Sequence, residues 1–90
     1  MRTRYRRHPS VESAPLQNET ILYHPEQNKF CLLNGTAAFL WDRLQQPTTE
    51  ESLSAEIIAQ FPGVDAARAE QDVREALKQF SELTFVVAEA

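Results

Sequence analysis

The sequence predicts an α+β fold in which an N-terminal antiparallel sheet of two or three strands precedes three helices. Short segments rich in β-branched and aromatic residues, separated by turn residues, fill the first third of the chain. Three later stretches repeat apolar residues at intervals of three and four, which is the spacing of amphipathic helices. A chain of 90 residues suits one small domain with a single core.

The first ten residues predict a mobile basic tail ahead of a domain that spans residues 11–90. Residues 1–7 hold four of the nine basic residues, and this segment lacks apolar periodicity. All thirteen acidic residues lie beyond it, so the predicted domain is acidic. An acidic domain argues against a DNA-binding surface built on phosphate contacts. The tail is either a solvated arm or a contact for an acidic partner.

Two or three strands are predicted in the first third. The optional one is residues 11–16, which are weakly marked because Pro15 lacks an amide donor and belongs at an edge or at a strand end. Residues 20–23 form a better one, and the turn residues 24–28 lead into a third strand over residues 29–33. The last two strands are expected to pair antiparallel.

The first helix is expected directly after the third strand, over residues 35–45. Asn34 is suited to be its N-cap, because a side-chain oxygen there accepts from the first free amides. The apolar stripe of this helix contains Trp41, which we expect to be a core residue whose indole N–H needs a partner. Pro47 ends this helix.

Two further helices are predicted over residues 49–60 and 66–83. Thr48-x-x-Glu51 has the form of a capping box for the first of these, and Asp65 is suited to cap the other. The inward stripe of the earlier helix would consist of Leu53, Ile57, Ile58 and Phe61. Residues 85–87 are β-prone and close a pattern that best matches a winged-helix-like domain.

The sequence contains no pattern typical of a catalytic, metal or cofactor site. Two glycines cannot build a glycine-rich phosphate loop, and Ser52, Ser54 and Ser81 lie in helical stretches without a neighbouring histidine. Cys31 is the only cysteine and is expected to be a packed apolar residue, while His8 and His24 have no ligand spacing. We therefore predict a non-catalytic protein without a cofactor. It has no membrane span or signal peptide, so we expect it in the cytoplasm.

Two surfaces could bind a partner. If strand 29–33 lies at the sheet edge, its free N–H and C=O groups can accept an extended peptide as an added strand. The third helix could instead be a DNA recognition helix. That alternative, a winged-helix transcriptional regulator, is disfavoured because the helix mixes Arg68, Arg74 and Lys78 with Glu70, Asp72, Glu75 and Glu82. A purely structural subunit of a larger complex is a third reading.

The segments that carry these features resemble the PqqD family, also called RiPP recognition elements. The resemblance covers residues 18–87 and includes the strand pair 21–25 and 30–34, the helix start Thr36-Ala37-Ala38, and Asp72-Val73-x-x-x-Leu77 in the third helix. The start of the second helix, 48–53, and Phe61-Pro62 belong to it too. The chain departs from the family where a glycine often precedes the last apolar residues, because Glu82-Leu83-Thr84 stands there.

The resemblance implies that a precursor leader peptide adds antiparallel to strand 29–33 and lies against the third helix. Ala76 would leave room for an apolar leader side chain, and Arg68 would pair with a leader acid. Carried over residue by residue, the leader-binding residues are Lys29, Phe30, Cys31, Leu32, Arg68, Asp72, Val73, Ala76 and Gln79.

The resemblance also implies that the protein acts in trans on behalf of a peptide-modifying enzyme. That enzyme would be a radical SAM protein, as for pyrroloquinoline quinone, or a leader peptidase with a cyclase, as for lasso peptides. The precursor and the modification are not specified by the sequence. An open strand edge also permits a homodimer, which would compete with the peptide.

Overall fold

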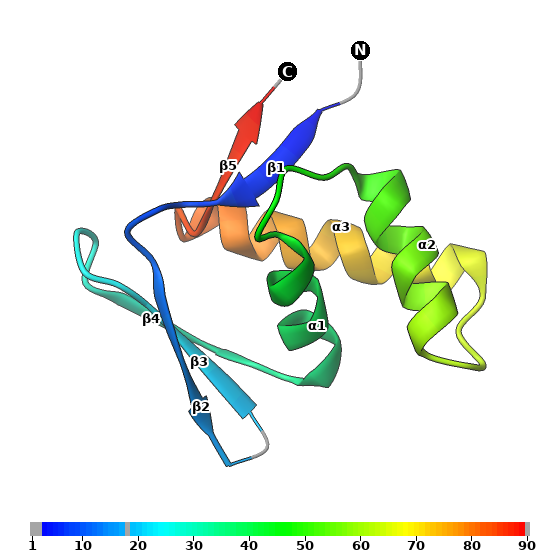
Figure 1. Cartoon of the computed structure of the whole chain (residues 1–90), viewed down its shortest axis with the longest axis horizontal. Coiled ribbons are helices and arrows are strands. Elements are labelled where there is room, and N and C mark those ends of the chain that lie inside the picture. Colours follow the sequence, from blue (N-terminus) through cyan, green and yellow to red (C-terminus); the bar gives the residue numbers. More distant parts are fainter. Residues whose placement is uncertain (1–2, 18, 90) are drawn as a thin grey trace.

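The computed structural model describes residues 3–17 and 19–89, and Figure 1 shows the arrangement of their helices and strands. The α+β prediction is confirmed: antiparallel strands precede three helices, and a C-terminal strand follows. The elements are β1 (Arg4–Arg7), β2 (Glu12–Leu16), β3 (Glu19–His24), β4 (Lys29–Leu33), α1 (Gly35–Arg43), α2 (Glu50–Gln60), α3 (Ala66–Glu82) and β5 (Val86–Glu89).

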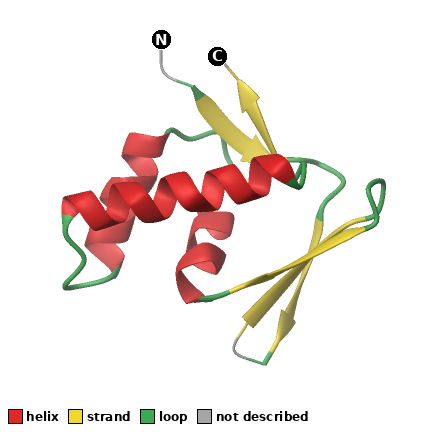
Figure 2. Ribbon diagram, turned by 180° about the vertical axis from the view of Figure 1, so that it is seen from behind, coloured by secondary structure: helices red, strands yellow, loops and turns green. Residues whose placement is uncertain are grey.

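The strands form two separate sheets. β2, β3 and β4 make an antiparallel meander in that order, with Pro15 on the edge strand β2, as its missing amide requires. β1 and β5 pair antiparallel as a two-stranded sheet. Both sheets lie toward the C-terminal end of α3, whereas α2 packs along the N-terminal half of that helix (Figure 2).

The N-terminal segment differs from the predicted basic tail, because residues Arg4–Arg7 form β1. Arg7 donates two hydrogen bonds to the carbonyl oxygen of Trp41, at 2.9 and 2.7 Å, and its guanidinium lies 4.7 Å from the centre of the indole ring. Tyr5 exchanges two backbone hydrogen bonds with Thr48. These partners are distant in sequence, so local composition could not reveal them. Residues 1 and 2 lie outside the described residues.

Side-chain caps fix the starts of all three helices. Asn34 accepts from the amide of Ala37 at 3.0 Å, and Asp65 accepts from the amide of Arg68 at 2.8 Å, which confirms both predictions. The cap of α2 is Thr49, which accepts from Ser52, and not the predicted Thr48. Thr48 cannot cap α2 because its backbone pairs with Tyr5 of β1.

One core joins the meander, the three helices and β5. Leu22 and Leu33 are the buried leucines that the meander contributes to this core. Trp41 packs edge-on against Phe80, with ring centres 5.6 Å apart. The predicted core position of Trp41 is confirmed, but its indole N–H has no hydrogen-bond partner among the described residues. The prediction that Ile58 faces inward is wrong: it is 43% exposed, and Ser54 is buried in its helix instead.

The end of α3 redirects the chain into β5 through a Schellman motif. The amide of Phe85 donates to the carbonyl of Phe80 at 2.7 Å, and that of Thr84 donates to Ser81 at 3.1 Å. Thr84 has φ = 63°, the left-handed conformation that usually selects glycine. Phe85 then enters the core, so the β-prone end predicted at residues 85–87 becomes one buried residue followed by β5.

The helices of the described residues are not membrane spans, since none combines enough length with enough hydropathy.

Candidate functional site

β4 is an edge strand of the three-stranded sheet, as the prediction required. It pairs with β3 from Thr20↔Leu33 to His24↔Lys29, and no other strand of the described residues pairs with its far side. In an antiparallel strand, every second residue directs its N–H and C=O away from a given neighbour. The far side of β4 therefore presents main-chain donors and acceptors to which an extended chain can pair.

The side chains of β4 alternate between the core and solvent. Cys31 and Leu33 are 7% and 1% exposed, whereas Phe30 and Leu32 are 62% and 51% exposed. Lys29 is half-buried. The edge therefore has an inner side next to the helices and an outer side with two free apolar groups.

α3 lies beside the inner side of β4. The side-chain amide of Gln79 donates a hydrogen bond to the sulfur of Cys31 at 3.4 Å, which joins the helix directly to the strand. Burial raises the pKa of the Cys31 thiol, so the group stays protonated and neutral at physiological pH. This cysteine is consequently a packed neutral group and lacks the environment of a nucleophile.

A hollow of about 240 Å³ opens between α1 and α3, where β4 ends. It brings together four of the predicted residues: Arg68, Asp72, Ala76 and Gln79. Arg68 and Asp72, one helical turn apart, approach to 3.9 Å, and Ala76 is half-buried. Because Gln79 lines the hollow and also reaches Cys31, we refer to the hollow and the neighbouring edge of β4 together as the β4–α3 groove.

Five further residues line the hollow and were not predicted: Asn34, Thr36, Ala37, Leu40 and Glu75. The first three form the start of α1, its predicted N-cap and first turn, for which no binding role was expected. Their spacing gave no sign that this start faces the middle of α3. Conversely, Val73 is fully buried in the core, so any part it has in binding must act through the packing of α3.

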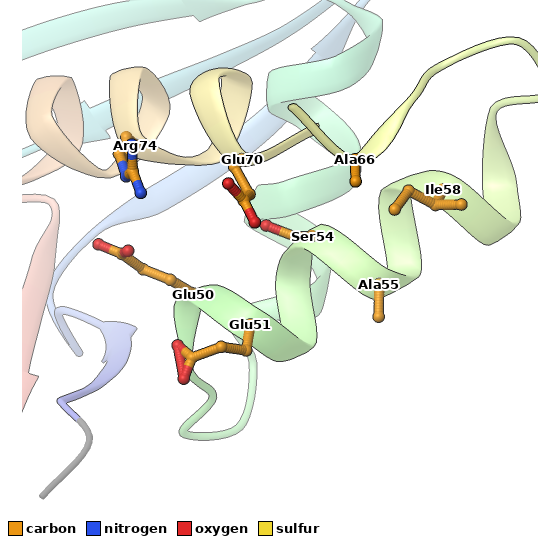
Figure 3. A pocket seen from close by; sticks show the side chains of 8 residues that line it. All are labelled: Glu50, Glu51, Ser54, Ala55, Ile58, Ala66, Glu70 and Arg74. Carbon is orange, nitrogen blue, oxygen red and sulfur yellow. The ribbon is translucent and has the colours of Figure 1, made fainter. Parts of the chain in front are cut away.

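A second hollow, of about 440 Å³, lies between α2 and α3 and away from β4. Figure 3 shows Glu50 on α2 facing Arg74 on α3 and Ser54 facing Glu70, with Ile58 farther along α2. Its size alone does not make it the functional site, because it lacks an open strand edge. Its charged lining suits a solvated surface.

The described residues contain no group of three or more His, Cys, Asp and Glu side chains placed to hold a metal ion. His24 is fully buried, and neither of its ring nitrogens has a hydrogen-bond partner among these residues. Its ring packs 4.5 Å from that of His8 and 6.1 Å from that of Phe85. The pair is part of the packing between the two sheets.

Comparison with protein families gives a match over residues 19–86 to the family described as coenzyme PQQ synthesis protein D (PqqD). The chain belongs to the PqqD family. The match begins with β3 and ends with the first residue of β5, so it contains the β4–α3 groove. No curated protein matches this PqqD-family chain significantly.

Two solved structures share its fold. One is TbiB1 in complex with the TbiA(beta) leader peptide, with a TM-score of 0.82 and 22% identity, covering 94% of this chain and 98% of that chain. The other is a lasso peptide synthetase B1 complexed with the leader peptide, with a TM-score of 0.79 and 19% identity, covering 92% and 96%. Both proteins were therefore solved with a leader peptide bound.

Proposed function

We propose that this PqqD-family protein binds the leader part of a ribosomally made precursor peptide and presents it to a maturation enzyme, without catalysing a reaction itself. The observation that carries the proposal is the open edge of β4 beside α3. An added strand gains main-chain hydrogen bonds along this edge, and these supply affinity for any extended segment. The two structural neighbours, each complexed with a leader peptide, support the proposal.

Selectivity would come from the wall of the β4–α3 groove. Ala76 leaves room for an apolar leader side chain, and Arg68 offers a cation to a leader carboxylate beside Asp72. We assign leader binding to residues 11–90 of the fold, to which β1 adds a strand that does not line the hollow. Its proposed contact residues are Lys29, Phe30, Cys31, Leu32, Arg68, Asp72, Ala76 and Gln79, and the buried Val73 supports them through the packing of α3.

The enzyme served in trans would be a radical SAM protein or a leader peptidase with a cyclase, acting in the cytoplasm. A recognition protein of this kind raises the local concentration of the precursor at the enzyme, so it needs no reactive group of its own. The neutral, packed state of Cys31 fits that role.

The test is a titration of ¹⁵N-labelled protein with synthetic leaders of the precursor peptides encoded in the same gene neighbourhood. We expect the amide signals of residues 29–32 and of α3 to shift together. Failure of every such leader to bind would contradict the proposal. A duplex DNA probe at moderate salt is the comparator, and binding of DNA without any peptide binding would favour the regulator alternative.

A matched pair of variants locates the site on α3. Ala76→Gln places a larger polar side chain in the groove while keeping a good helix former, and we expect affinity to fall about tenfold or more. Lys78→Gln changes an exposed residue of the same helix that does not line the groove, and its affinity should match that of the wild type. Equal affinity of the two variants would place binding elsewhere.

A further inference from the structure

The outer face of the meander carries apolar side chains that the core does not use. Cross-strand pairing puts Tyr23 beside Phe30 and Ile21 beside Leu32. Tyr23 and Ile21 are half-buried and lie outside the core cluster of the described residues, and the rings of Tyr23 and Phe30 are 4.6 Å apart. Two apolar rows therefore lie across β3 and β4 on the side of the sheet away from the helices.

Both rows end at the open edge of β4. Their last members, Phe30 and Leu32, have the two largest exposed fractions among the large apolar side chains of the described residues, at 62% and 51%. At the other edge of the sheet the rows end in Glu12, opposite Tyr23, and Ala14, opposite Ile21. The apolar surface is thus concentrated at the β4 edge of the sheet and not at the β2 edge.

An added strand necessarily presents side chains on both faces of the sheet. Residues of the guest that lie opposite Cys31 point toward α3, and those opposite Phe30 and Leu32 point to the outer face. A guest side chain directly opposite an apolar residue is its nearest cross-strand neighbour, at about 4.5–5.5 Å between Cβ atoms. One apolar guest residue can therefore pack beside Phe30 and another beside Leu32, so that each row continues onto the added strand.

We propose that Phe30 and Leu32 select leader segments with aromatic or β-branched side chains at two alternating positions, i and i+2, which face away from α3. This specificity rests on the proposed function, because it requires strand addition to β4. The site would then recognise the guest on both faces of the sheet. α3 would contact the side chain at position i+1, and Phe30 and Leu32 would contact the side chains at positions i and i+2. A peptide with polar residues at i and i+2 would leave both apolar groups in water.

The probe is a displayed library of random 16-residue peptides, selected on the wild type and on the Phe30→Thr/Leu32→Thr double variant. Threonine keeps β propensity, and both positions are exposed, so the fold should survive. We expect wild-type binders to share apolar residues at i and i+2, and the double variant to lose that preference while keeping the preference at i+1. For a selected peptide, affinity should fall about tenfold in the double variant, from the loss of two cross-strand pairs.

Ala14→Thr is the matched control, because this exposed residue shares the outer face but lies at the opposite edge of the sheet. Its binders and affinities should equal those of the wild type. Binders with polar residues at i and i+2, or an unchanged affinity in the double variant, would overturn the inference while leaving strand addition intact. A library without any binder would contradict the proposed function itself.

Sedimentation of the wild type with and without a selected peptide tests the competing occupant of this edge. We expect a monomer in both cases, or a dimer that the peptide dissociates. A dimer that persists with bound peptide in the wild type and dissociates in the Phe30→Thr/Leu32→Thr variant would place a second copy over these residues and overturn the inference.

Discussion

Cys31 lies at the contact between the edge strand β4 and α3. As the only cysteine of the sequence it was expected to be a packed apolar residue, and the structure confirms this, with 7% exposure. The sequence could not indicate that Gln79, on another element, donates a hydrogen bond to its sulfur. That contact depends on how α3 crosses the sheet, which no local pattern encodes.

The raised pKa of Cys31 predicts slow alkylation. The thiolate is the reactive form, so a higher pKa leaves less of it at pH 8 than in the unfolded chain. We expect native protein to react with iodoacetamide more slowly than protein unfolded in urea, and the rate to rise at a higher pH. Because Cys31 is the only thiol, mass spectrometry reports this site alone. Equal rates in the two states would show that the thiol is not buried.

At the scale of elements, the strands of the meander and the three helices follow from sequence periodicity and capping residues. Asn34 and Asp65 begin their helices as predicted, because the N-cap interaction is local. The N-cap of α2 was predicted one residue too early. Thr48 forms a β-bridge with Tyr5, and the next residue, Thr49, caps the helix. Ile58 was misplaced because helical spacing alone does not tell how far the buried face extends.

The end of α3 gives a stability prediction. A β-branched residue at φ = 63° is strained, and glycine adopts this conformation without a Cβ clash. After the entropy cost of glycine in the unfolded chain is subtracted, Thr84→Gly should stabilise the protein by about 0.5–1 kcal/mol.

Urea unfolding followed by circular dichroism measures this change. Ser81→Gly, inside the same helix, is the control and should destabilise by about 0.5 kcal/mol. If Thr84→Gly lowers the free energy of unfolding, the contacts of the threonine side chain stabilise the protein by more than its backbone strain destabilises it.

At the scale of the molecule, β1 connects the N-terminal segment to the end of α1 and to β5. Arg7 binds the last turn of α1 through the Trp41 carbonyl, and Arg6 pairs with Glu89 of β5 at 2.7 Å. Burial lowers the pKa of Arg7, which nevertheless remains charged. Residues expected to be a tail are thereby part of the fold.

Arg7→Ala should destabilise the protein by about 1–2 kcal/mol, because it removes two charge-assisted hydrogen bonds and the contact with the indole ring. Thermal unfolding and tryptophan fluorescence measure the effect. Arg4→Ala removes an exposed arginine of the same strand and should change stability by less than about 0.5 kcal/mol. Equal effects of the two variants would indicate a general charge effect and no specific role for Arg7.

The sequence by itself determined the local features: the order of strands and helices, the caps at Asn34 and Asp65, and the apolar strand at residues 30–33. These depend on neighbours within a few residues, so spacing reveals them. Only the tertiary structure decided that β4 is left at the sheet edge, that Phe30 and Leu32 face solvent, that Val73 is covered, and that the basic N-terminus pairs with β5. Each of these depends on contacts between distant segments, which form only when the whole chain packs around one core.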